Sequence, residues 1–163
     1  EPLFYVKEKG WKLSVDGAKR VIALDSVKGL GEHGIEFRFT SDRSKLPKDN
    51  NINFAQFSWS LEARIPGGGF VESISDYQFE APEIGYEETI KIKYDAAMAR
   101  EDWKRRVYRR YFVKFADGSY GRIFFSIDGS SESTPLDMAS WLGLSPGVRN
   151  LSSNDWDPSR VTE

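Results

Sequence analysis

Apolar and polar residues alternate along most of the chain with a period of two, the pattern of β-strands with one buried and one solvated face. The alternation is clearest over residues 11–15, 35–39, 57–65 and 89–94. Asp16-Gly17 is a turn signal followed by the apolar run 20–24, which predicts a hairpin between 11–15 and 20–24. The glycines at 67–69 likewise predict a hairpin between 57–65 and a strand over 70–79.

A further hairpin is predicted between 107–115 and 122–127, joined around Asp117-Gly118-Ser119. Because opposite residues of an antiparallel pair share a face, the apolar pattern favours Phe115 opposite Gly121. This register places Val113 opposite Ile123 on one face, and Phe112 opposite Phe124 on the other. We expect Gly118 to adopt a positive φ in the turn.

The coarse organisation is that of an all-β protein. Roughly seven or eight short strands with turn signals between them predict an antiparallel β-sandwich of jelly-roll or immunoglobulin-like type. The alanines in 95–102 allow at most one short helix there. We expect a single sandwich domain over 1–151 and a C-terminal tail over 152–163.

Composition excludes several chemistries. The 163 residues include no cysteine and one histidine, which removes thiol nucleophiles, thiolate zinc sites and histidine clusters, so we expect no metal and no cofactor. The Asx-rich loops 48–51 and 154–157 are more typical of turns than of calcium sites. A net charge of −2 predicts no specific nucleic-acid partner. No apolar run of about 18 residues is present, so no membrane span is expected.

Two groups of residues are candidates for catalysis. A jelly-roll glycosidase needs two carboxylates facing one cleft, and the hairpin predicted around 67–69 would bring Glu62 close to Glu72 or Asp76. The simpler interpretation is that these are solvent-facing carboxylates paired with neighbouring cations. His33 lies in a glycine-flanked loop without an evident nucleophile, so we expect a loop residue. We assign no catalytic residue.

The segment 100–114 is strongly basic and contains interleaved aromatic residues, a composition that also occurs on polyanion-binding surfaces. Alternation along a strand would send Arg106, Arg110 and Lys114 to one face and Arg105 and Arg109 to the other. The pattern therefore favours a divided patch whose charges are answered by carboxylates on adjacent strands.

Aromatic residues supply the candidate ligand-binding positions. Trp11 and Trp59 fall at apolar strand positions and are expected in the core, since such rings dominate packing. Four others fall in predicted loops or at strand ends, where rings can stack on the face of a sugar: Trp103, Trp156, Tyr86 and Tyr120.

Three segments together resemble a pattern in uncharacterised exported bacterial proteins of planctomycete and verrucomicrobial type. They are Phe79-Glu80-Ala81-Pro82-Glu83-Ile84-Gly85-Tyr86, the 111–127 hairpin with Tyr120-Gly121-Arg122-Ile123, and Leu144-Ser145-Pro146-Gly147-Val148-Arg149-Asn150-Leu151. The resemblance covers about the C-terminal half of the chain. It implies a β-rich, exported protein, periplasmic or extracellular, and no activity.

We therefore expect a non-catalytic exported β-sandwich module that binds a ligand or partner through its end loops, with a glycan or another protein as the partner. The alternatives are a jelly-roll carbohydrate-active enzyme using strand carboxylates, and a structural or assembly domain. A chain that begins with Glu1-Pro2 fits a processed protein or a piece of a longer one.

Overall fold

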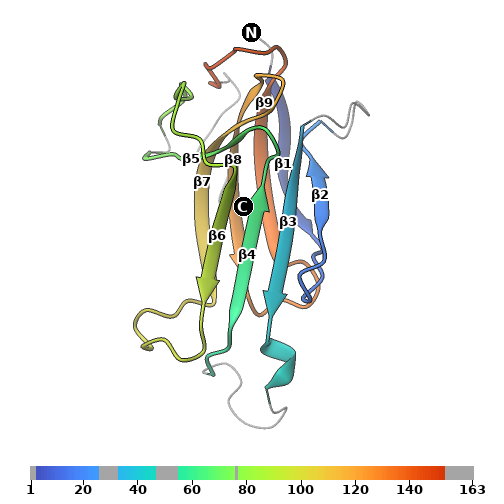
Figure 1. Cartoon of the computed structure of the whole chain (residues 1–163), viewed down its shortest axis with the longest axis vertical. Helices are drawn as coiled ribbons and strands as arrows, with labels where there is room; N and C mark the ends of the chain where they lie inside the picture. The colour runs from blue at the N-terminus through green and yellow to red at the C-terminus, as the bar shows by residue number, and fades with distance from the viewer. Residues whose placement is uncertain (1–2, 26–32, 47–54, 76, 153–163) are drawn as a thin grey trace.

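The chain folds into two antiparallel sheets that pack face to face in an elongated sandwich (Figure 1). The computed structural model describes residues 3–25, 33–46, 55–75 and 77–152. The five-stranded sheet has the order β1 (Leu3–Trp11), β9 (Leu136–Gly143), β8 (Tyr120–Asp128), β7 (Arg106–Lys114) and β5 (Gly69–Glu72). The four-stranded sheet has the order β2 (Arg20–Ala23), β3 (Gly34–Ser41), β4 (Trp59–Arg64) and β6 (Thr89–Tyr94). The predicted antiparallel β-sandwich is confirmed.

The core lies between the sheets and consists of the inward-facing residues of both. From the four-stranded sheet, Phe37, Phe39 and Trp59 are almost fully buried. The Trp59 indole N–H donates to the Lys104 carbonyl at 2.8 Å, so this buried polar group is satisfied. The opposite sheet contributes Ile123 and Ile127, among others. Their polar neighbours in sequence point outward, which is why a period of two predicted these strands.

The β7–β8 hairpin forms, but the predicted register is wrong by two residues. Val113 lies opposite Gly121 and Phe112 opposite Arg122. The cause is a tighter turn, since the Phe115 N–H donates to the Ser119 carbonyl at 2.9 Å and leaves only three loop residues. Gly118 has a φ of 87°, as predicted. Because a shift of two preserves the face of every side chain, Phe112 and Phe124 still face away from Val113 and Ile123.

The predicted hairpin between 11–15 and 20–24 is not formed. β1 extends from Leu3 to Trp11 and pairs with β9, whereas β2 pairs with β3 in the other sheet. Residues 12–15 carry the chain from one sheet to the other, and Leu13 is buried on the way. Its apolar side chain therefore fits the alternation without belonging to a strand.

The predicted hairpin between 57–65 and 70–79 is also wrong. β4 pairs with β3 and β6, while β5 pairs with β7 in the opposite sheet. The turn after Ile65 is thus a crossing between sheets. Gly68 makes it possible, because a Cβ at this position would lie 1.9 Å from the Lys114 carbonyl oxygen.

The segment 95–102 and the C-terminal boundary of the domain were also predicted from the sequence. Residues 95–102 form turns without a helix, held by N–H groups that donate to the carbonyls of Asp95 and Ala99. The domain boundary predicted at 151 falls beside Leu151, which is buried and whose N–H donates to the Phe79 carbonyl at 2.9 Å. Most of the predicted tail, residues 153–163, lies outside the described residues.

Candidate functional site

The outer face of the five-stranded sheet has a covered end and an open end. At the covered end, Ala81 and Leu151 pack over Phe112 and Tyr120 in a second, smaller apolar cluster. Phe79 lies over the Arg122 guanidinium, with the ring centroid 4.9 Å from its carbon. Nothing in the described part of the chain forms such a cluster over the other end, which leaves an open surface.

The open end contains a hollow of about 280 Å³ that spans four strands. Its lining is Glu8 from β1, Ala139 from β9, Phe124, Phe125 and Ser126 from β8, and Tyr108, Arg109 and Arg110 from β7. We call this the sheet-face groove. It is mostly apolar with charged groups at opposite sides, the usual make-up of a ligand site.

Strand register explains why the sheet is hollowed here. Ala139 lies opposite Phe124, and Ser126 lies opposite Tyr108, so small side chains form the floor between larger ones. On the far side, β1 shifts its register between Val6 and Lys9, a bulge in the region of Glu8. The groove therefore has a floor of small residues. Tyrosine and arginine side chains form one wall, and a glutamate forms the other.

Exposed aromatic rings flank the groove. Tyr108 is 70% exposed at its rim, and Tyr5 is 50% exposed on the neighbouring row. Tyr5 stacks on the buried Trp141 with ring centroids 5.1 Å apart, and Trp141 meets Phe124 edge to face at 5.2 Å. Packing of this kind holds Tyr5 at a fixed place, with its outer surface open to solvent.

Of the predicted ligand-binding residues, Tyr86 and Tyr120 lie together, with ring centroids 6.0 Å apart. Tyr120 is only 6% exposed. The Tyr86 hydroxyl donates to the Pro82 carbonyl at 2.8 Å, and burial raises the pKa of this hydroxyl well above its usual range. Both rings are thus engaged in packing at the covered end of the sheet.

The other two predicted residues are not placed with them. Trp103 packs edge to face on Phe57 at 5.1 Å, and its indole N–H donates to the Phe57 carbonyl at 2.9 Å. It lies in the loop between β6 and β7, at the opposite end of the sandwich from the β7–β8 turn (Figure 1). Trp156 lies outside the described residues.

Of the candidate catalytic carboxylates, Glu62 and Glu72 lie on different sheets. Glu62 lies on the outer face of the four-stranded sheet, between Arg38 and Lys91 of the adjacent strands. Glu72 ends β5 in the five-stranded sheet, and Asp76 is not described. The hairpin that was expected to bring Glu62 and Glu72 together does not exist, because β4 and β5 belong to different sheets.

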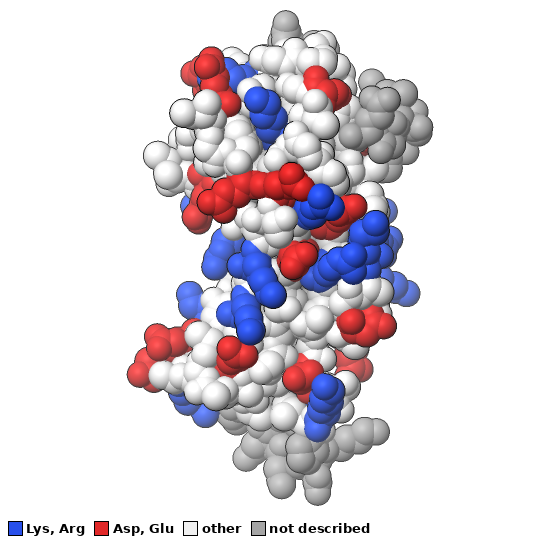
Figure 2. All heavy atoms as spheres, in the orientation of Figure 1, with Lys and Arg blue, Asp and Glu red and all other residues white. Residues whose placement is uncertain are grey.

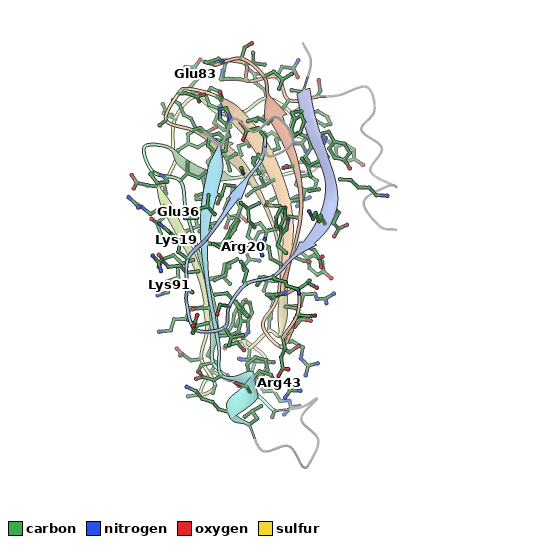
Figure 3. The ribbon with its side chains drawn as sticks, turned by 90° about the vertical axis from the view of Figure 1, so that its right-hand side faces the viewer. Lys19, Arg20, Glu36, Arg43, Glu83 and Lys91 are labelled. Carbon is green, nitrogen blue, oxygen red and sulfur yellow. The ribbon has the colours of Figure 1, made fainter. Side chains whose placement is uncertain are left out.

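The outer face of the four-stranded sheet is polar and mixed in charge. Figure 2 shows Lys and Arg side chains interspersed with Asp and Glu over this face. Arg64 pairs with Glu88 at 2.7 Å and with Glu36 at 3.5 Å, and Lys19 also pairs with Glu36 at 3.5 Å. In Figure 3, Lys19, Glu36 and Lys91 lie on the side of this sheet away from the core.

The basic stretch is divided as its alternation predicted. Arg110 and Lys114 share the outer face of β7 with Phe112, while Arg109 lies opposite Phe125 on the inward-facing row. Arg106 pairs across the hairpin with Asp128 at 3.1 Å. The sheet-face groove was not predicted from the sequence. Tyr108 and Arg110 meet Ser126, Ala139 and Glu8 only through strand pairing, and alternation alone does not specify that pairing.

Among the residues that the structure describes, no nucleophile lies beside His33. Both of its ring nitrogens face carboxylates, Asp25 on one side and Asp117 on the other. Within the described residues, no three histidine, aspartate or glutamate side chains are arranged to hold a metal ion. No helix within these residues is long and apolar enough to cross a membrane.

Comparison with known proteins adds no relative. No family model matches the chain, no curated protein matches it, and no solved structure matches it. The resemblance to exported planctomycete and verrucomicrobial proteins thus remains a prediction.

Proposed function

We propose that the chain is a non-catalytic binding module whose ligand is a glycan lying across the sheet-face groove. The observation that carries the proposal is the position of Tyr108, whose exposed ring forms the rim of a hollow floored by Ser126 and Ala139. A sugar ring presents a face of C–H groups that packs on an aromatic ring, and hydroxyls at its edge that seek charged hydrogen-bond partners. Glu8 and Arg110 supply such partners on opposite sides of the groove.

A sheet face favours a glycan over a peptide strand. A peptide that extends a sheet pairs with the backbone of an edge strand, such as β1 or β5. The floor of the groove belongs to β8 and β9, both interior strands whose backbone groups are already paired. The site therefore offers side chains and little free backbone. In this respect the proposal differs from the sequence-based prediction, which assigned binding to the end loops.

Replacing Tyr108 with alanine tests the proposal. A stacking contact is worth about 0.5–1.5 kcal/mol beyond burial, so Tyr108→Ala should weaken glycan binding several-fold, and Tyr5→Ala should add to the loss. A glycan array would identify the ligand, and calorimetry or affinity gels would measure each variant. Tyr77→Ala is the matched control, because this tyrosine is equally exposed but lies in the loop after β5.

The outcome also separates this proposal from its alternatives. Loss of binding on replacing Tyr86, Tyr120, Trp103 or Trp156, with Tyr108→Ala unaffected, would move the site to the end loops. Hydrolysis of a glycan that is abolished by Glu62→Gln would replace the binding module with an enzyme. The proposal includes export, and fractionation of cells that express the natural gene would test it.

A further inference from the structure

A histidine and two carboxylates connect the two sheets at one end of the sandwich. His33 directly precedes β3 and Asp25 follows β2, both in the four-stranded sheet, while Asp117 lies in the β7–β8 turn of the five-stranded sheet. His33 Nδ1 lies 2.9 Å from Asp25 Oδ2, and Nε2 lies 2.7 Å from Asp117 Oδ2. The imidazole thus bridges segments that are 84 residues apart in sequence.

The Asp25 half of the bridge is shielded from water, and the Asp117 half is more open to it. The side chain of Asp25 is 4% exposed and that of His33 is 12% exposed, whereas Asp117 is 36% exposed. The Phe115 ring meets the imidazole edge to face, with ring centroids 5.0 Å apart and the two planes at 81°. Interactions between charges are stronger in such surroundings than in bulk water.

With both carboxylates ionised, the geometry calls for the doubly protonated imidazole. An ionised carboxylate only accepts hydrogen bonds, so both ring nitrogens must donate. A neutral imidazole carries one N–H, and its other nitrogen would face a carboxylate oxygen with a lone pair. One of the two contacts is therefore lost when the ring loses a proton.

We infer that Asp25, His33 and Asp117 form a pH-dependent clasp between the two sheets, closed when His33 is protonated and weakened when it is neutral. The partners that face the imidazole are Asp25 from the end of β2, Asp117 from the β7–β8 turn and the uncharged Phe115. Among the described residues, His33 is the cation paired with either carboxylate. Asp117 is further held by the Ser119 N–H, which donates to its other oxygen at 2.8 Å.

The directions of the pKa shifts agree with this geometry. Burial alone would lower the pKa of His33, but the hydrogen bonds to Asp25 and Asp117 outweigh it and the pKa is raised. Burial would raise the pKa of Asp117, but the hydrogen bonds from Ser119 and His33 outweigh it and the pKa is lowered. The contribution of His33 to the free energy of unfolding is thus complete below about pH 6.5, the ordinary histidine pKa. It is lost as pH rises through the folded-state pKa of His33. The contribution of Asp117 is lost as pH falls below about 3.9.

Proton NMR tests the clasp directly, because His33 is the one histidine of the chain and its ring signals need no assignment by mutation. We expect its pKa above 6.5 in the wild type, and a lower value in both Asp25→Asn and Asp117→Asn. A His33 that titrates below the ordinary value, or that is insensitive to both substitutions, would overturn the inference. The direct titration keeps the test decisive even if one variant unfolds.

Amide exchange gives the second measurement. The Leu24 N–H donates to the His33 carbonyl at 3.0 Å and should lose protection as the clasp opens between pH 6 and pH 8, by about ten-fold for each unit by which the His33 pKa is raised. The Gly17 N–H, bonded to the Phe39 carbonyl at 2.8 Å, is the reference amide and should change only with the intrinsic rate. His33→Gln should remove the pH dependence at Leu24. Equal changes at both amides would argue for general loosening and against a clasp.

Discussion

At the scale of single residues, Arg122 shows most clearly how side-chain chemistry is used in this sandwich. It is 1% exposed, and its guanidinium lies within about 6 Å of four ring centroids, those of Phe79, Phe112, Phe124 and Trp141. A flat, weakly hydrated cation can stack on aromatic faces in a way that a lysine ammonium cannot. Arg122 therefore joins the segment that carries Phe79 to the sheet beneath it.

Substitution of Arg122 should separate the effects of charge and shape. We expect Arg122→Ala to lower the free energy of unfolding by about 3 kcal/mol, through lost packing and cation–π contacts. Arg122→Lys keeps the charge but should still cost about 2 kcal/mol, because its ammonium cannot stack and is costlier to dehydrate. Urea unfolding followed by tryptophan fluorescence measures both. A loss of less than about 1 kcal/mol for Arg122→Ala would contradict this account.

At the scale of strands and turns, the local pattern of side chains predicted where most strands lie but not which strands pair. The strands at 35–39, 89–94 and 107–115 were found because their side chains alternate, and that alternation is a local consequence of the pleat. The partner of each strand is set by contacts across the whole chain. For this reason two predicted hairpins proved to be crossings between sheets, and β1 was recognised only at its last residue, Trp11.

The sheet-face groove illustrates the same limit. Tyr108 and Arg110 could be predicted to share a face of their strand, because they are two residues apart. Glu8 and Ala139 belong to strands more than 100 residues apart in sequence, and only the pairing of β1, β9, β8 and β7 brings them to one surface. The loop aromatic residues could be identified from the local sequence, whereas no local sequence pattern indicates the groove.

Gly68 is the turn residue on which the crossing from β4 to β5 depends. Gly68→Ala would place a methyl group 1.9 Å from the Lys114 carbonyl oxygen, so the backbone must move, and we expect a loss of about 3 kcal/mol in the free energy of unfolding. Gly147→Ala is the matched control. It has a positive φ of 83° but no heavy atom within 4 Å, so it should cost about 1–2 kcal/mol of backbone strain. Thermal unfolding would compare the two, and equal losses would show that the crowding at Gly68 is relieved without cost.

At the scale of the whole molecule, charge is spread so that neither sheet presents a continuous field of one sign. The net charge is −2, the four-stranded sheet mixes cations with carboxylates, and the basic residues of β7 point to two faces. Surface pairs such as Arg64 with Glu88 contribute little to stability individually. Their main effect is to neutralise what would otherwise be a basic face.

This distribution predicts weak binding to polyanions. On a heparin column we expect retention only at low ionic strength and elution below about 0.15 M salt, where the Debye length falls to about 8 Å. Arg106→Gln should leave the elution position almost unchanged, because this cation is already paired with Asp128. Retention well above 0.15 M salt would mean that the divided basic residues act together after all.

The pairing of β1 with β9 also sets a condition on the time course of folding. Leu3 lies opposite Gly143, so the five-stranded sheet cannot be completed until β9 has been synthesised. β1 must stay unpaired while all the other strands emerge, and contacts this distant in sequence slow folding because a long loop has to close first. The four-stranded sheet has no such constraint, since its strands are complete at Tyr94. During synthesis the molecule therefore passes through a stage in which the four-stranded sheet can pair while β1 still lacks its partner β9. A nascent chain at that stage exposes the apolar side chains that the finished sandwich encloses.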